Sequence, residues 1–236
     1  MPVLAIPTTS GTGSESTASA ILTSHEERTK ISIKPRVYCE KAFINFRYTY
    51  YLANEITAST AVDVLSHLID GYMSAQANMI TDHFSEGGFY RFSSCLPALK
   101  SKAYDVAFRN EIQLISIIGG IVIANTRTTL PHLMSYPLTY DKSVPHGFAC
   151  GLLTYEFLQF HEDKNKIEQM LSLCGFESLD KLGSFLSSVC PPTVCNENEI
   201  TAYSHIVYSD QERLKLHPYE VRLEDIMNIY RRSLTR

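Results

Sequence analysis

The sequence contains no tryptophan, no Cys-x-x-Cys pair and no long apolar run. A helix that crosses a membrane needs about 20 predominantly apolar residues, whereas runs such as residues 117–124 are far shorter. No basic segment followed by an apolar stretch and a cleavage site opens the chain. The six cysteines are scattered without paired spacing. We therefore expect a soluble protein in a reducing cytoplasm.

The sequence also lacks an excess of positive charge, because Lys and Arg total 21 against 25 Asp and Glu, for a net charge of -4. This balance gives no electrostatic basis for binding nucleic acid or an anionic membrane, so we expect neither as a partner. The 236 residues are 44% hydrophobic and 19% charged, which excludes a disordered chain. They are enough for one large domain or two small ones.

The first 47 residues hold short apolar segments separated by turn residues. The apolar segments cover residues 3–7, 18–23, 30–33 and 41–46, and residues 25–28 form a polar connection typical of a hairpin. This pattern predicts three or four strands. A sheet of so few strands leaves backbone hydrogen-bonding groups unpaired, so the β part looks incomplete.

After residue 46 glycine becomes sparse and apolar residues recur at spacings of three and four, which predicts helices. Pro191 and Pro192 mark a break between two of them. The predicted helices cover residues 57–74, 81–96, 111–126, 147–160, 164–173, 179–187, 197–207 and 223–233.

Asp63 and His67 lie four residues apart in a predicted helix, so their side chains share one face and could chelate a metal ion. An Asp and a His at this spacing are more often a surface ion pair. Two further histidines, His132 and His146, lie in apolar or turn-forming surroundings without an adjacent charge. Each could instead be a histidine at the core edge or a helix cap.

Taken together, one carboxylate and three imidazoles make a donor set that suits Fe²⁺ or Zn²⁺. Such a set leaves a position open for a substrate oxygen, as catalytic metal sites do.

The segment of residues 8–15 consists almost entirely of Thr, Ser and Gly and follows a predicted strand. Such residues are ordinary turn material. Alternatively, their hydroxyls and backbone amides could bind a phosphate or a ribose. The chain contains neither G-x-G-x-x-G nor G-x-x-x-x-G-K-[ST], so neither standard phosphate-binding motif is present.

Three features of the sequence carry a family resemblance, namely residues 5–15, the Asp63-x-x-x-His67 pair, and His132 followed by Pro145-His146-Gly147. Together they resemble the iron-activated (group III) alcohol dehydrogenases. Within that family, residues 125–139 and 212–218 look most like phosphonoacetaldehyde reductases. The resemblance implies an α/β plus all-α fold. Residues 1–47 would be a remnant of a Rossmann-like nucleotide-binding domain, and residues 48–236 an α-helical, dehydroquinate synthase-like metal-binding domain. The family's glycine-rich diphosphate loop would be missing.

The resemblance also implies roles for individual residues. Lys30 would reach toward the ribose or a phosphate of a nicotinamide cofactor, and four threonines would line that cofactor. The threonines are Thr8, Thr9, Thr12 and Thr17, and the implied metal ligands are Asp63, His67, His132 and His146.

Two residues depart from the family pattern or add to it. Tyr136 stands four residues after the third implied ligand, where many members have histidine, so a catalytic proton relay would pass through its phenol or through water and a ribose hydroxyl. Tyr136 could instead only pack in the core. Arg127 could neutralise a phosphonate on the substrate, or could pair with a carboxylate on a helix surface.

The implied activity is metal-dependent, NAD(P)-linked interconversion of a small aldehyde and its primary alcohol, with phosphonoacetaldehyde and 2-hydroxyethylphosphonate as the leading pair. A general short-chain alcohol dehydrogenase is an alternative, with glycerol or hydroxybutyrate as further substrates. Another alternative is a truncated or split-gene product that binds metal but is inactive alone. The chain would bind the small aldehyde or alcohol substrate. It would also associate with further copies of itself as a homo-oligomer, or with a separate N-terminal chain. Iron or zinc, and NAD or NADP, remain open.

Overall fold

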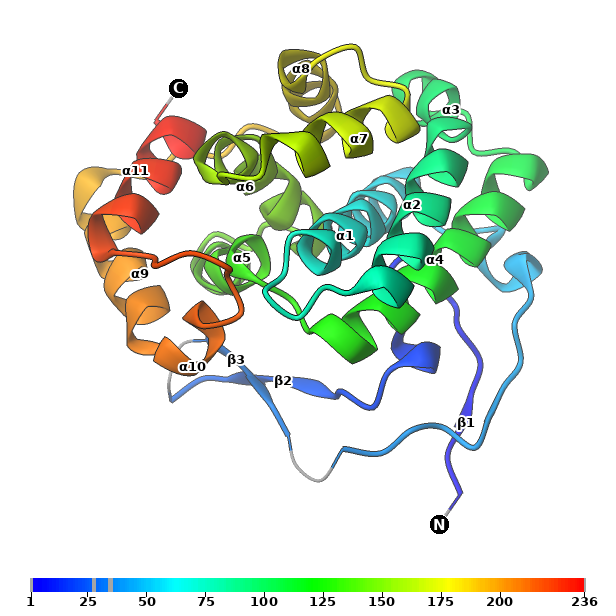
Figure 1. Cartoon of the computed structure of the whole chain (residues 1–236). Helices are drawn as coiled ribbons and strands as arrows, with labels where there is room; N and C mark the ends of the chain where they lie inside the picture. Colours follow the sequence, from blue (N-terminus) through cyan, green and yellow to red (C-terminus); the bar gives the residue numbers. More distant parts are fainter. Residues whose placement is uncertain (1, 27–28, 34–35, 236) are drawn as a thin grey trace.

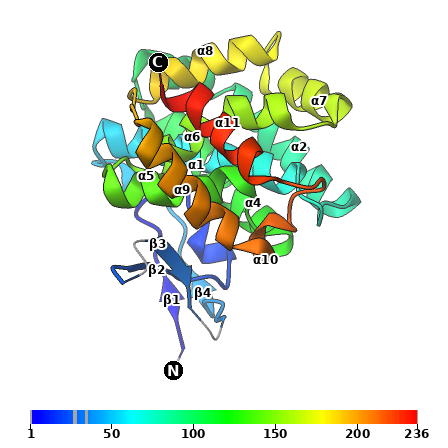
Figure 2. The same cartoon turned by 90° about the vertical axis from the view of Figure 1, so that its left-hand side faces the viewer.

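The computed structural model describes residues 2–26, 29–33 and 36–235. A body of helices carries a small strand-containing region at one end, close to the N-terminus (Figures 1 and 2). The fold class is therefore α/β plus all-α, with a small β part, as the sequence predicts.

The strands form two separate pairs in the described residues. Strand β1 (Leu4–Ala5) runs parallel to β4 (Lys41–Ala42), and β2 (Ile21–Ser24) is antiparallel to β3 (Thr29–Ser32). Each of the four predicted strand segments overlaps one of these strands. Residues 27–28 of the predicted polar connection lie outside the described residues. Two short 3₁₀ helices, η1 (Ser14–Ser16) and η2 (Phe46–Thr49), complete this region.

The eight predicted helices are confirmed to within a few residues, except that residues 81–96 are not one helix. The first helix of this segment ends at Ser93. A second helix begins at Leu96 with Pro97 in its first turn, where proline is tolerated. Side-chain caps fix several helix starts, including the capping boxes at Asn78 and Asn196. The helices are α1 (Asn54–Tyr72), α2 (Met79–Ser93), α3 (Leu96–Ser101), α4 (Val106–Thr126), α5 (Leu130–Asp141), α6 (His146–Phe160), α7 (Lys164–Cys174), α8 (Leu179–Val189), α9 (Glu197–Ser209), α10 (Gln211–Leu214) and α11 (Leu223–Leu234).

Helix α5 is absent from the sequence-based prediction because two prolines punctuate it. Pro131 stands in the first turn, where a backbone donor is not needed, but Pro137 lies inside the helix. Tertiary contacts hold the helix despite this interior proline, because residues 130–138 are all buried. The Tyr230 hydroxyl also donates to the Met134 carbonyl at 2.6 Å.

Helix α1 runs through the middle of the molecule, between α2, α4, α5 and α6 (Figure 1). Its apolar residues Ala61, Val62, Val64, Leu68 and Ile69 are all fully buried. Helix α4 is long and apolar enough to cross a membrane by length and composition alone, but half of its most apolar window is buried in this structure. Its packing against α1 and α2 is that of a core helix.

The loop that follows β1 lies directly on α4. The Ser116 hydroxyl accepts hydrogen bonds from the Gly11 amide at 2.8 Å and the Gly13 amide at 3.3 Å. Gly13 has a φ of 59°, and a Cβ on Gly120 would lie 2.5 Å from the Gly13 carbonyl oxygen. Loop and helix can approach this closely only because both positions are glycine.

We predict that Gly120→Ala lowers the free energy of unfolding by about 1–3 kcal/mol, because the added methyl group must push the loop away from α4. Gly87→Ala is the matched control. Gly87 lies in α2 with nothing near its missing Cβ, so alanine there should stabilise by about 0.5–1 kcal/mol. Urea denaturation of both variants measures the difference. Equal effects of the two substitutions would contradict the close approach.

Candidate metal centre

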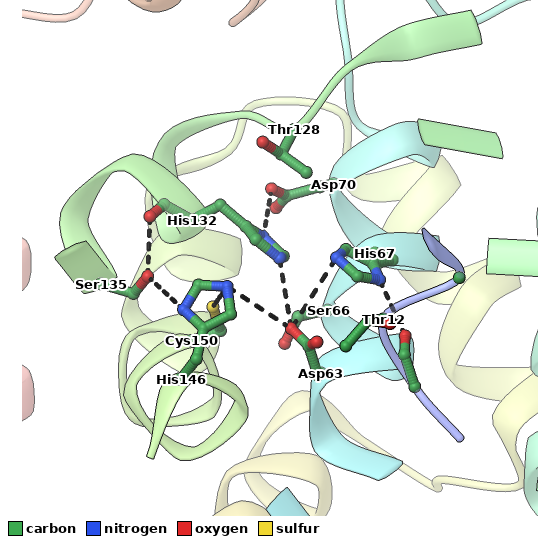
Figure 3. Close-up of polar contacts among 12 residues, drawn as sticks. Thr12, Asp63, Ser66, His67, Asp70, Thr128, His132, Ser135, His146 and Cys150 are labelled. Atoms are coloured by element: carbon green, nitrogen blue, oxygen red, sulfur yellow. Dashed lines mark hydrogen bonds and ion pairs between the residues drawn. The ribbon is translucent and has the colours of Figure 1, made fainter. Parts of the chain in front are cut away.

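Helix α1 presents three polar residues on one face, at intervals of about one turn. Asp63, His67 and Asp70 are exposed by only 3%, 5% and 0%, although they carry charged or titratable groups. Spacings of four and three residues place their side chains one above another along the helix. This buried polar stripe is the base of the candidate site (Figure 3).

Two other helices complete the group. His132 projects from the first turn of α5 and is 2% exposed, and His146 is the first residue of α6. The next residue, Gly147, lets α6 approach α1 very closely, because a Cβ there would lie 1.8 Å from the Ser59 carbonyl oxygen. Any larger residue at this position would keep His146 away from Asp63.

All three imidazoles point at one carboxylate oxygen (Figure 3). Asp63 Oδ1 lies 3.8 Å from His67 Nε2, 3.5 Å from His132 Nε2 and 3.7 Å from His146 Nε2. Oxygen and nitrogen ligands bound about 2.1 Å from a tetrahedral ion are about 3.4 Å apart. The structure thus brings together the four residues that the sequence singles out, at separations close to those of a shared ion.

The opposite nitrogen of each imidazole has its own hydrogen-bond acceptor. His67 Nδ1 donates to the Gly11 carbonyl at 3.1 Å, and His132 Nδ1 donates to Asp70 Oδ2 at 2.8 Å. The Ser135 hydroxyl donates to the His132 carbonyl at 2.7 Å, so its oxygen accepts from His146 Nδ1 at 3.2 Å. With Nδ1 held by these acceptors, each ring turns its Nε2 toward Asp63.

The buried polar atoms at the centre are not satisfied by the protein alone. Asp63 Oδ1 and His132 Nε2 are both buried without a hydrogen-bond partner. Burial alone would raise the pKa of Asp63, but the neighbouring His67, His146 and His132 hold it well below its usual range. Burial lowers the pKa of His67 to about 4, so this ring is neutral at pH 7. An ionised carboxylate among imidazole lone pairs is a suitable donor set for a divalent cation.

Four further groups lie at the candidate site and were not predicted from the sequence. Asp70 and Ser135 orient His132 and His146, and the Gly11 carbonyl orients His67. Cys150 lies one turn after His146 on α6, with its Sγ 4.0 Å from His146 Nε2. Helical spacing could have revealed Asp70, three residues after His67, and Cys150, four after His146. Nothing local could have revealed the contact of Gly11.

Cys150 is fully buried beside two of these histidines. Burial alone would raise the pKa of its thiol, but the neighbouring His132 and His146 lower it to about 6. The other core cysteines behave differently, since burial raises the pKa of Cys95 and of Cys190 to about 12.

The four threonines that were predicted to contact the cofactor come after β1 in the sequence and differ in how far they are exposed. Thr8 and Thr12 are exposed, Thr9 is half-buried and Thr17 is buried. Thr12 lies beside His67 and Asp63, because the preceding residue Gly11 contacts His67 (Figure 3). Exposed hydroxyls next to the metal-ligand candidates could meet a bound molecule.

Lys30 on β3 lies on the other side of the site. Its Nζ is 6.0 Å from the centre of the Tyr136 ring. It borders a cavity of about 380 Å³ that is also lined by Thr23, His25, Thr139 and Tyr140.

Tyr136 is buried against the candidate metal centre, with its ring 5.9 Å from that of His146. Arg213 Nη2 donates to the Tyr136 hydroxyl at 3.2 Å and to Thr128 Oγ1 at 2.9 Å. Arg127 is an exposed residue at the end of α4 with a φ of 60°. Partial burial of its guanidinium, together with the nearby Arg213 and Arg36, lowers its pKa. The guanidinium that contacts Tyr136 is therefore that of Arg213, which sequence spacing did not single out.

The chain matches two models of one protein family. Residues 57–234 match the model of the Fe-containing alcohol dehydrogenase family, C-terminal, and residues 1–45 match that of iron-containing alcohol dehydrogenase. The chain belongs to the iron-containing alcohol dehydrogenase family. The predicted family resemblance is thereby confirmed.

Three relatives illustrate the similarity of this chain to members of that family. An iron-containing alcohol dehydrogenase of Thermotoga maritima is 33% identical with a TM-score of 0.90, over 99% of this chain and 64% of that one. Sulfoacetaldehyde reductase from Bifidobacterium kashiwanohense, in complex with NAD⁺, is 26% identical with a TM-score of 0.86, over 99% and 65%. The 4-hydroxybutyrate dehydrogenase of Clostridium kluyveri is 29% identical over 98% and 67%. The chain spans about half the length, or less, of several other curated relatives that it matches.

We predict that Asp70→Asn weakens the binding of Zn²⁺ by about 10–100-fold, because Asp70 Oδ2 fixes the orientation and basicity of His132. Competition with a chromophoric chelator measures the affinity. Asp180→Asn on the exposed face of α8 is the control and should change nothing. If both variants bind zinc as tightly as the unchanged chain, His132 does not act as a ligand oriented by Asp70.

Proposed function

We propose that this chain forms the metal-binding part of an NAD(P)-linked oxidoreductase that interconverts a small aldehyde and its primary alcohol. The observation that carries the proposal is the convergence of three imidazole Nε2 atoms on Asp63 Oδ1, at 3.5 to 3.8 Å. Two of these buried atoms lack any partner from the protein. Membership of the iron-containing alcohol dehydrogenase family supports the same reaction class.

Asp63, His67, His132 and His146 would hold the ion, and a set of one carboxylate and three imidazoles fits Fe²⁺ or Zn²⁺. When bound, such an ion acts as a Lewis acid on a substrate oxygen. The three Nδ1 hydrogen bonds keep the rings in place, so that little reorganisation accompanies binding.

Tyr136 would hold the proton that completes the alcohol. Arg213 donates to the phenol oxygen, so the Tyr136 proton remains free to be donated to another group. Thr128 shares the same guanidinium and limits its movement. The nearness of the Tyr136 ring to that of His146 supports this role.

Thr8, Thr9, Thr12, Thr17 and Lys30 would contact the nicotinamide cofactor. The exposure of Thr8 and Thr12, and the position of Thr12 beside His67, support this assignment. The NAD⁺ complex of the B. kashiwanohense relative supports a nicotinamide cofactor, with NAD or NADP left open.

We propose phosphonoacetaldehyde as the substrate, because cationic groups gather around Tyr136. Arg213 lies 4.9 Å and Lys30 6.0 Å from the centre of its ring, and Arg213 is close enough to Arg127 to lower the pKa of the Arg127 guanidinium. A tetrahedral anion accepts hydrogen bonds well from guanidinium groups. Sulfoacetaldehyde reductase and 4-hydroxybutyrate dehydrogenase, whose names give anionic substrates, are among the relatives. A general short-chain alcohol dehydrogenase is the alternative.

We further propose that residues 1–47 belong to the nucleotide-binding part and residues 48–236 to the helical metal-binding part. A second candidate is that the chain binds metal but is inactive alone. Exposed apolar side chains along β1 and β4 favour it, since these strands pair only with each other in the described residues. A nucleotide-binding segment, in the same or a separate polypeptide, or a second copy of the chain, would cover them. The six free cysteines support a location in the cytoplasm.

The test follows oxidation of NADH and NADPH by phosphonoacetaldehyde after loading with Fe²⁺ or Zn²⁺. The chain is assayed alone and together with a nucleotide-binding segment of the family. We expect turnover when the segment is present and its loss in Asp63→Asn, because an uncharged amide binds the ion poorly. Full activity of Asp63→Asn would overturn the metal-dependent reaction. Activity of the chain alone would remove the inactive-fragment candidate.

Arg213→Gln should lower kcat/KM for phosphonoacetaldehyde by about 10–100-fold, the value of one or two charge-assisted hydrogen bonds. Propanal serves as the uncharged comparison, since a displaced Tyr136 would slow both substrates alike. Lys215→Gln, an exposed neighbour paired with Glu212, is the control. Arg127→Ala in the same assay tests the sequence-based assignment. Equal losses for both aldehydes would rule out recognition of the phosphonate by either arginine.

A further inference from the structure

We propose that Cys150 is an additional ligand of the metal ion, through its Sγ as a thiolate. This inference rests on the metal site of the proposed function and extends it by one residue. Cys150 lies on α6 one turn after His146, so the two side chains share a face of that helix. One ligand atom from each of Asp63, His132, His146 and Cys150 lies within 4.8 Å of all the others.

The distance between sulfur and nitrogen is within the range of a shared ion. Cys150 Sγ lies 4.0 Å from His146 Nε2. With metal–sulfur and metal–nitrogen bonds of about 2.3 and 2.1 Å, two ligands of a tetrahedral ion are about 3.6 Å apart, and an angle widened to about 130° separates them by about 4 Å. A shift of a few tenths of an ångström is enough to bring Sγ into the coordination shell.

The surroundings of Cys150 point to a cation rather than to simple packing. Asp63 Oδ1 and His132 Nε2 are almost completely buried, unpartnered and members of the same cluster. A cysteine that only fills space has no need of such neighbours. Cys174, for example, is equally buried on α7 but belongs to the hydrophobic core.

Five candidate ligands therefore surround one ion, and they form two alternative sets of four. Asp63, His132 and His146 are common to both, while His67 and Cys150 differ. Figure 3 shows His67 on one side of the Asp63 carboxylate, with His146 and Cys150 on the other. A set with His67 offers only nitrogen and oxygen, which suits Fe²⁺, whereas a set with Cys150 adds a soft sulfur that favours Zn²⁺ or Co²⁺.

Coordination of the ion by Cys150 requires that the thiol lose its proton. The Sγ–H bond breaks, its proton passes to solvent, and the sulfur lone pair forms the bond to the divalent ion without any change of oxidation state. The site then carries two negative ligands, Asp63 and Cys150, which together neutralise the charge of the ion.

The test loads the whole chain with Co²⁺ and records its absorption spectrum. We expect an intense near-ultraviolet band from sulfur-to-cobalt charge transfer in the unchanged chain and in the control Cys174→Ala, and its loss in Cys150→Ala. Cys150→Ala should also weaken Zn²⁺ binding by about tenfold or more, since even groups behind the ligands cost about 10–100-fold. Fe²⁺ binding should change less.

Two outcomes would overturn the proposal. One is Co²⁺ bound to the unchanged chain with weak visible bands but without the charge-transfer band. The other is a band that persists when Cys150 is replaced. Failure of the proposed function gives a separate result, since the chain would then bind Co²⁺ no better than Asp63→Asn does.

Discussion

The candidate metal centre depends on three hydrogen bonds that lie behind the candidate ligands. Each imidazole gives its Nδ1 proton to an acceptor of the protein, namely Gly11, Asp70 or Ser135. Without these bonds a ring could rotate or change tautomer, and its Nε2 lone pair would no longer face Asp63. The protein thereby maintains unpartnered polar atoms in its interior, each at a cost of about 1–3 kcal/mol. A bound cation would satisfy these atoms, so metal binding and stability are linked.

Close packing of backbones makes this geometry possible. Gly147 allows α6 to lie against the Ser59 carbonyl of α1, and Gly11 allows the loop after β1 to lie against the Thr60 carbonyl. The two contacts are on adjacent residues of α1, one turn before Asp63. The first turn of α6 and the loop are therefore both positioned by the same short stretch of the central helix. Residues from four segments converge because α1 is enclosed by its neighbours.

Much of the fold and part of the site could be predicted from the sequence, for physical reasons that differ by residue. Helices such as α1 follow from apolar spacing, and Asp63 with His67 follows from the periodicity of one helix. Helix α5 could not be predicted, because Pro137 violates local preference and tertiary burial overrides it. Arg213 could not be connected with Tyr136 either, since 77 residues separate them. Contacts of that range leave no periodic signal in a single sequence.

The loop of residues 8–15 joins the metal centre to the exposed β region. The Gly11 carbonyl orients His67, while the Gly11 amide is held by Ser116 of α4. One peptide segment thus links the rigid core helix to a metal-ligand candidate. Thr12, the next residue, is exposed. A molecule that moved Thr12 would also move the acceptor of His67, so binding at this loop and the geometry of the metal centre cannot be independent.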